Sequence, residues 1–221
     1  MDDTEQIYFR RKLFLSSILP VFLITLMWLV SITESLFGLD FTKGGIYPLK
    51  IEGLPGIILS PFIHDDFVHL FNNSLPLLFL TIALFYFYPG IAIKVFIWTY
   101  LLTGLLVWIA GRPAWHIGAS GLVYGIASFH FFSGIIRKHF RLIALSLLIV
   151  FLYGSMVWGL FPGVYKNVSW ESHMLGFFSG ILLAIFFRHE GPQQPVYDWM
   201  EEEDDGQKDI IDANIEDQSE K

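Results

Sequence analysis

The sequence contains no cysteine among its 221 residues, and charged side chains make up only 16% of it. The absence of cysteine excludes a thiol nucleophile, a Cys-based zinc site and disulfides. No basic patch with interleaved aromatic residues is present, so the sequence indicates no nucleic-acid partner. The motif HExxH is also missing, and His64 and His69 are poorly spaced to share one helical face with Asp65 or Asp66. We therefore expect no bound metal and no cofactor.

Apolar residues, in contrast, are abundant: 54% of the chain is hydrophobic and 17% is aromatic. Apolar runs of about 18 or more residues are typical of transmembrane helices. Six such runs predict an all-α membrane protein with six spans, near residues 13–33, 67–88, 91–110, 120–136, 142–160 and 169–187. The long connection 34–66 is rich in Gly and Pro, and its apolar pieces are too short to span. We expect it to lie at the membrane interface.

Charged residues gather outside these runs and predict how the chain is organised. We expect a cytoplasmic segment at residues 1–12, one six-span domain at residues 13–188, and an acidic, disordered cytoplasmic tail at residues 189–221. The first apolar run is too long for a signal peptide and lacks a small-residue cleavage site. Most Lys and Arg residues flank the inner ends of the spans if both termini are cytoplasmic. These features predict a multi-pass protein of the cell membrane that contacts the lipid bilayer.

In this orientation, Ser120 and His173 lie at matching depth at the outer ends of two different spans. Serine is a favoured helix N-cap, and a membrane histidine can be a structural hydrogen-bonding group. A serine hydroxyl becomes a good nucleophile when a neighbouring base accepts its proton, and neutral histidine is such a base near pH 7. We therefore predict a catalytic Ser-His dyad on the outer side. Only Glu171, at the edge of the span, offers a carboxylate beside His173, so the dyad is expected to lack an acid.

Small residues follow both of these side chains at helical spacing. The two stripes are Gly121 with Gly125, and Gly176 with Gly180. Faces of this kind let two membrane helices approach closely, so the stripes are expected to pack together and to bring the imidazole within reach of the hydroxyl. The same stripes also suit ordinary helix packing.

His69 and Asn73 are four residues apart and share one face at the outer end of the second span. Acyl transfer develops negative charge on the substrate carbonyl oxygen, and fixed N–H donors stabilise that charge. We predict His69, Asn73 and the free backbone N–H of Ser120 as these donors, although a pair of interfacial polar residues bonded to loop backbone fits the pattern as well. Tyr124, one turn beyond Ser120, can stack on the imidazole or serve as a core aromatic.

Several motifs, in chain order, resemble those of the rhomboid family of intramembrane serine proteases, of bacterial type. Residues 69–73 are similar to its HxxxN, residues 118–125 to its GxSGxxYG, and residues 172–180 to its AHxxGxxxG, with Ser172 in place of the commoner Ala. The segment 56–64 also resembles the family's first loop. GxSG alone occurs in many soluble hydrolases, but its combination with the other motifs is specific.

The resemblance covers about residues 13–188 and implies a six-transmembrane-helix rhomboid-like bundle. It implies Ser120 as nucleophile, His173 as general base, His69 and Asn73 as oxyanion donors, and Tyr124 stacked on the histidine. Supporting positions implied by the motifs are Gly118, Gly121, Gly176 and Gly180. The expected partners are membrane proteins, cleaved in or near their transmembrane segments at helix-destabilised sites with small residues. The Trp-Arg pair that some family members carry in the first loop is missing.

Two other functions compete with proteolysis. An inactive rhomboid-like protein would bind membrane clients, but such relatives lack the serine or the histidine, and this chain has both. A small transporter would carry ionisable residues within several spans and an internal repeat. No repeat is visible, and the polar groups gather at one end of the predicted bundle.

Overall fold

The computed structural model describes residues 3–164 and 169–193 of the chain. Within these ranges every regular element is a helix, and one isolated β-bridge joins Ile46 to His116. The elements are α1 (Asp3–Phe37), η1 (Thr42–Gly44), η2 (Ile51–Gly53), α2 (Gly56–Leu59), η3 (Ser60–Phe62), α3 (Phe67–Phe87), α4 (Ala92–Ala110), α5 (Ser120–Arg137), α6 (Phe140–Tyr153), η4 (Gly154–Leu160) and α7 (Trp170–Phe186). The all-α prediction is therefore confirmed.

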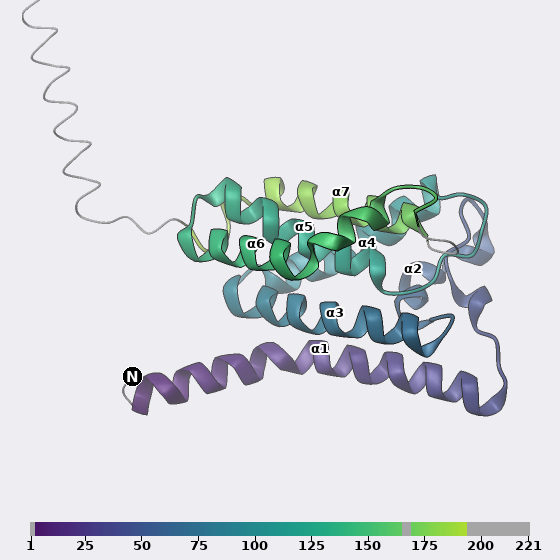
Figure 1. The fold of residues 1–221 in the computed structure, drawn as a ribbon, viewed down its shortest axis with the longest axis horizontal. Coiled ribbons are helices and arrows are strands. Elements are labelled where there is room, and N and C mark those ends of the chain that lie inside the picture. The colour runs from purple at the N-terminus through teal and green to yellow at the C-terminus, as the bar shows by residue number, and fades with distance from the viewer. Residues whose placement is uncertain (1–2, 165–168, 194–221) are drawn as a thin grey trace, which may run out of the picture.

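The long helices run back and forth along one direction, so that α3, α5 and α7 begin at the same end of the bundle (Figure 1). We call this end the outer end. Helix α1 packs along α3 at one edge of the bundle, and α5 lies centrally against α7, α4, α3 and α6. The six predicted spans correspond to α1, α3, α4, α5, α6 with η4, and α7. This arrangement brings the starts of three helices together around one polar region.

Two predicted boundaries differ from the structure. Helix α1 (Asp3–Phe37) is longer than the predicted span at residues 13–33, because the polar residues that flank the apolar run continue the same helix. The fifth predicted span divides at Gly154, where α6 gives way to the 3₁₀ helix η4. The predicted acidic tail lies outside the described residues beyond Gln193.

Within the described ranges, four segments are long and apolar enough to cross a membrane: α1, α3, α4 and the combined segment Phe140–Leu160. Helix α7 is shorter, with 17 residues, and α5 is rich in small and polar residues. The composition of α5 follows from its central position, because neighbouring helices cover most of it, whereas α7 exposes Phe178, Leu182 and Phe186 on its outer face. Many large apolar side chains are exposed on the surrounding helices, among them Phe14, Phe22, Phe79 and Phe151. Such a belt is the surface that a bilayer requires.

Close contact between α5 and α7 depends on their glycines. A Cβ atom added to Gly176 would lie far inside van der Waals contact with the backbone oxygen of Gly121. One added to Gly180 would meet the backbone oxygen of Gly125 and the hydroxyl of Ser128 in the same way. The predicted small-residue stripes do face each other, and their missing side chains let the two backbones touch.

At the outer end, main-chain hydrogen bonds hold together the two connections that precede α3 and α5. Ile46 and His116 exchange two of them, with N···O distances of 2.9 and 2.8 Å, which joins the connection after α1 to the one before α5. The N–H of Gly118 donates to the carbonyl of Ser60 at 2.8 Å. The segment that leads into α5 is therefore fixed on both sides just before Ser120.

Candidate active site

Ser120 is the first residue of α5 and is half-buried. The N-cap position belongs to Ala119, and no side chain caps the helix there. The alternative that Ser120 serves as the N-cap is therefore wrong, and its hydroxyl stands beside the uncapped start of the helix. The chain turns into α5 through Gly118, whose φ of +96° is a conformation that side chains rarely adopt.

His173 lies in the first turns of α7 and is only 7% exposed. Its ring stacks on that of Tyr124, with centroids 4.2 Å apart and an angle of 12° between the planes. Because Tyr124 is one turn beyond Ser120, this stack places the imidazole beside the first turn of α5. The stacking arrangement expected for these two rings is present.

The hydrogen bonding of His173 determines which nitrogen is basic. Its Nδ1 lies 2.9 Å from the carbonyl oxygen of Gly159 in η4. A carbonyl can only accept, so Nδ1 carries the proton and donates it. The lone pair of the neutral ring therefore resides on Nε2, the nitrogen that a general base would use.

His69 and Asn73 lie together on α3, directly against the loop before Ser120. A Cβ atom at Gly118 would lie 3.0 Å from Nε2 of His69 and 3.6 Å from Nδ2 of Asn73. Asn73 is 5% exposed, and its Nδ2 has no hydrogen-bond partner within the described part of the chain. A buried N–H donor without an acceptor is costly. The Asn73 amide can therefore gain by donating a hydrogen bond to a molecule bound in the site.

A polar cavity of about 670 Å³ opens at this end of the bundle. Its lining includes Ser120 and His69 together with Asp65, Asp66 and Arg112. At ~30 Å³ per molecule, this volume corresponds to roughly twenty waters. Water can therefore reach the serine although the surrounding helices are apolar.

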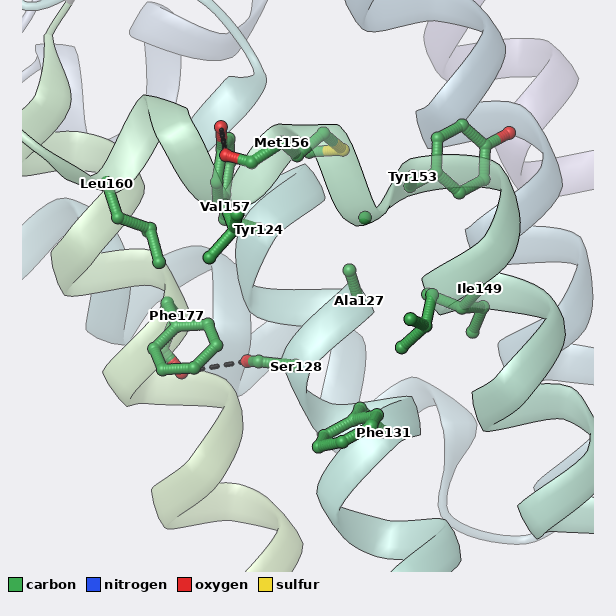
Figure 2. Close-up of a pocket in the computed structure, with 12 residues that line it drawn as sticks. Tyr124, Ala127, Ser128, Phe131, Ile149, Tyr153, Met156, Val157, Leu160 and Phe177 are labelled. Carbon is green, nitrogen blue, oxygen red and sulfur yellow. Dashed lines mark hydrogen bonds between the residues drawn. The ribbon is translucent and has the colours of Figure 1, made fainter. Parts of the chain in front are cut away.

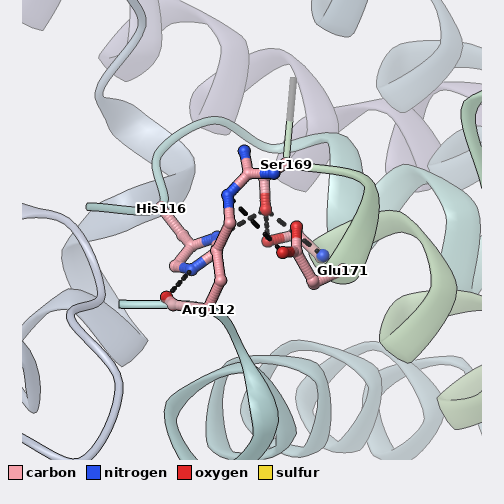
Figure 3. A network of polar contacts seen from close by, with 5 residues as sticks. Arg112, His116, Ser169 and Glu171 are labelled. Carbon is pink, nitrogen blue, oxygen red and sulfur yellow. Dashed lines mark hydrogen bonds and ion pairs between the residues drawn. The ribbon is translucent and has the colours of Figure 1, made fainter. Parts of the chain in front are cut away.

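A polar network ties the loop before α5 to the start of α7 (Figure 3). His116 is buried; its Nδ1 lies 2.5 Å from Oγ of Ser169, the N-cap of α7, and its Nε2 donates to the carbonyl of Arg112 at 3.0 Å. Burial lowers the pKa of His116, so the ring stays neutral and can accept from the serine hydroxyl through Nδ1. The Nε atom of Arg112 lies 3.5 Å from Oε1 of Glu171.

This network was not predicted from the sequence. Ser169 lies 53 residues beyond His116, and Arg112, four residues before it, is bonded through its main-chain carbonyl, so no side-chain motif could pair them. It also shows that Glu171, the only carboxylate considered beside His173, is engaged with an arginine instead.

His64 packs edge-on against His69, with ring centroids 5.0 Å apart. It is 4% exposed, and burial lowers its pKa to about 3, so the ring is neutral at physiological pH. Within residues 3–164 and 169–193, no group of three or more His, Asp or Glu side chains is arranged to hold a metal ion. Of this pair, the His69 ring lies against Gly118.

Comparisons with known proteins agree with this architecture. The family model described as "Rhomboid domain" matches residues 52–190, the greater part of the chain. An uncharacterized protein of Mycobacterium tuberculosis is 32% identical over 173 residues, which cover 73% of this chain and 70% of that protein. An uncharacterized protein of Mycobacterium leprae is 32% identical over 170 residues, covering 72% of this chain and 66% of that one.

Proposed function

The chain belongs to the rhomboid family, and from that premise we propose that it is an intramembrane serine endopeptidase with Ser120 as nucleophile and His173 as general base. The observation that carries the proposal is the state of His173. Its Nδ1–H is taken up by a carbonyl and its ring is stacked on Tyr124, beside the uncapped start of the helix that bears Ser120. This is the arrangement that a base needs to act through Nε2.

Acylation starts when Nε2 of His173 accepts the proton of the Ser120 hydroxyl while Oγ attacks the carbonyl carbon of the scissile peptide. The carbonyl oxygen of the resulting tetrahedral intermediate is negatively charged. The unpaired amide of Asn73, the ring N–H of His69 and the backbone N–H of Ser120 are the donors available to stabilise it. His173 then returns the proton to the leaving amine, which departs and leaves an acyl-enzyme.

Deacylation repeats these steps with water as the nucleophile. A water molecule from the polar cavity beside Ser120 gives its proton to Nε2 of His173 and attacks the ester carbonyl. Collapse of the second tetrahedral intermediate returns the proton to Oγ of Ser120 and releases the new carboxyl end. The cavity thus supports hydrolysis in a site surrounded by apolar helices.

The substrates are single-span or multi-span membrane proteins. A peptide bond inside a transmembrane helix is protected by helical hydrogen bonding, so cleavage requires a local unwinding that Gly and other small residues ease. The proposed orientation places both termini in the cytoplasm and the outer end, with Ser120, on the opposite side of the cell membrane. Cleavage is therefore expected in the outer part of the substrate span.

The proposal is tested by incubating the purified protein in detergent with a panel of single-span substrates and mapping the products by mass. The panel varies one feature, the presence of small, helix-destabilising residues in the outer half of the span. The expected result is cleavage within that half, blocked by a fluorophosphonate. If no member of the panel is cleaved while the protein still binds the substrates, it is a client-binding member of the family instead.

Removing the unpaired amide is expected to slow catalysis without weakening substrate binding. The variant Asn73→Ala should reduce kcat by about 10²-fold to 10³-fold with little change in KM, since the amide would stabilise charge that exists only in the transition state. Asn72→Ala is the matched control, because Asn72 is the exposed neighbour on the same helix and its side chain lines the same cavity. It removes an amide from the cavity wall but not the buried donor, and it should stay within about threefold of wild type. Equal kcat values for the two variants would exclude Asn73 from the oxyanion site.

A further inference from the structure

The segment η4 is an unusually long 3₁₀ helix. It runs over the seven residues Gly154–Leu160 and continues the axis of α6 toward the outer end. Runs longer than three or four residues are uncommon, because the hydrogen-bond geometry of this helix is poor, and such stretches often mark functional segments. Its position relative to the dyad indicates what this one does.

Two carbonyl groups of η4 hold the two stacked rings. The hydroxyl of Tyr124 donates to the carbonyl of Met156 at 2.6 Å, and Nδ1 of His173 donates to the carbonyl of Gly159 at 2.9 Å. The two rings come from different helices, α5 and α7. The segment η4 therefore holds both stacked rings by hydrogen bonds, one to the hydroxyl of Tyr124 and one to Nδ1 of His173. Nε2 of His173 lies on the other side of the imidazole.

We propose that η4 is the positioning segment of the dyad and that the carbonyl of Gly159 takes the orienting place of the missing acid. The inference rests on the proposed function. In a Ser-His-Asp site the carboxylate fixes the tautomer and the orientation of the imidazole. The Gly159 carbonyl does both here, because it can only accept and so holds the proton on Nδ1.

A neutral acceptor also suits the surroundings better than a carboxylate would. A charged side chain within a membrane-spanning bundle is costly, whereas a main-chain carbonyl brings no net charge. A 3₁₀ helix leaves its last carbonyls unpaired within the helix, so Gly159 offers this acceptor at no cost to internal bonding. The segment supplies an oriented dipole where a charge would have to be buried.

Only glycine fits at position 159. A Cβ atom there would lie 3.0 Å from Nδ1 of His173 and well inside van der Waals contact with the hydroxyl of Tyr124. Any larger residue must therefore push η4 away from the two rings or push the rings apart. This close approach makes the position a direct probe of the proposed role.

Away from these contacts, one side of η4 borders a cavity, while Met156 packs against the apolar core. An apolar cavity of about 270 Å³ lies between η4 and α6 on one side and α5 and α7 on the other, bounded by Ala127, Ile149, Val157 and Phe177 (Figure 2). The Tyr124 and Met156 pair stands at its rim. The cavity interrupts apolar packing on this side, so the two hydrogen bonds help to fix the position of η4 relative to α5 and α7. A displacement of η4 away from these helices would break both bonds at once.

The test compares three variants with wild type in the intact protein in detergent, by substrate cleavage and by the rate of labelling with a fluorophosphonate. Gly159→Ala is expected to lower kcat and the labelling rate by about 100-fold, with KM within about threefold of wild type. Gly154→Ala is the matched control in the same segment, because a Cβ there meets only Cγ1 of Val150, at 3.8 Å, and it should keep wild-type rates.

The third variant is the double substitution Tyr124→Phe with Gly159→Ala. Phenylalanine keeps the stacked ring but removes the hydroxyl that the new methyl group meets first. Tyr124→Phe alone is expected to lower kcat and the labelling rate by about fivefold, which corresponds to the loss of one hydrogen bond. The double variant should be faster than Gly159→Ala, since the shortest contact of the methyl group is removed. Its contacts with Nδ1 of His173 at 3.0 Å and with Cζ of the ring at position 124 at 3.3 Å remain, so it should stay slower than Tyr124→Phe.

The outcomes separate this inference from the proposed function. If wild type and Gly154→Ala cleave and label while Gly159→Ala does so equally well, η4 does not position the dyad. A folded double variant that stays as slow as Gly159→Ala would overturn the inference too, because relief of the clash would then be irrelevant. If wild type neither cleaves nor labels, the protease assignment itself fails.

Discussion

Ser120→Ala and His173→Ala are each expected to reduce cleavage of a single-span substrate by about 10⁴-fold or more. The serine supplies the attacking atom and the histidine accepts its proton, so neither works without the other. The double variant should therefore be no slower than either single one. Rates are measured by product formation in detergent, with folding checked by thermal unfolding.

Matched controls exist on the same helix. Ser128 and His130 are buried in α5 away from the polar cavity that contains Ser120. Ser128 donates to the carbonyl of Phe177, and His130 bonds to the carbonyl of Leu80. Ser128→Ala and His130→Gln should keep cleavage within about tenfold of wild type while lowering thermal stability. Near wild-type cleavage by His173→Ala, with cleavage lost in His130→Gln, would show that the base is the other histidine.

Gly176→Ala is expected to have the second largest effect, on both stability and activity. The added Cβ would meet the backbone oxygen of Gly121, which cannot rotate away as a side chain would. Helices α5 and α7 must then separate, which costs about 1–3 kcal/mol of stability by overpacking. A shift of about 1 Å between nucleophile and base costs about 10²-fold in rate, so cleavage should fall by that factor.

The control for this prediction is Gly154→Ala, an equal change of size at an open position. Thermal unfolding in detergent and kcat are measured for both variants. If contact between the two small-residue stripes sets the geometry of the dyad, Gly176→Ala must lose stability and rate together. Wild-type behaviour of that variant would mean that the helices have room to spare and that their contact does not determine where the nucleophile and the base lie.

Much of the fold could be predicted from the sequence, because hydrophobic runs of membrane length are a strong signal. The spans of α3, α4, α5 and α7 were located within a few residues. The start of α1 was missed because polar residues near a membrane surface can extend a helix as easily as end it. The division at Gly154 was missed since α and 3₁₀ helices share their composition.

The candidate site was predictable where side chains carry it. The spacing of His69 and Asn73 indicated that they share a face, and that face lies against Gly118, while Tyr124 stacks on His173; their catalytic roles stay predictions. The acceptor for His173 was not predictable, because every residue has a carbonyl and only the fold selects Gly159. The N-cap alternative for Ser120 could likewise be discarded only once Ala119 was seen in that place.

Labelling by a water-soluble fluorophosphonate, followed by peptide mass mapping, is the sharpest test of the nucleophile assignment. The probe reacts with an activated serine and needs no knowledge of the physiological substrate. One adduct on Ser120 is expected in wild type, strongly reduced in His173→Ala and absent in Ser120→Ala. Labelling that persists in Ser120→Ala, or an adduct mapped to another serine, would contradict the proposed dyad.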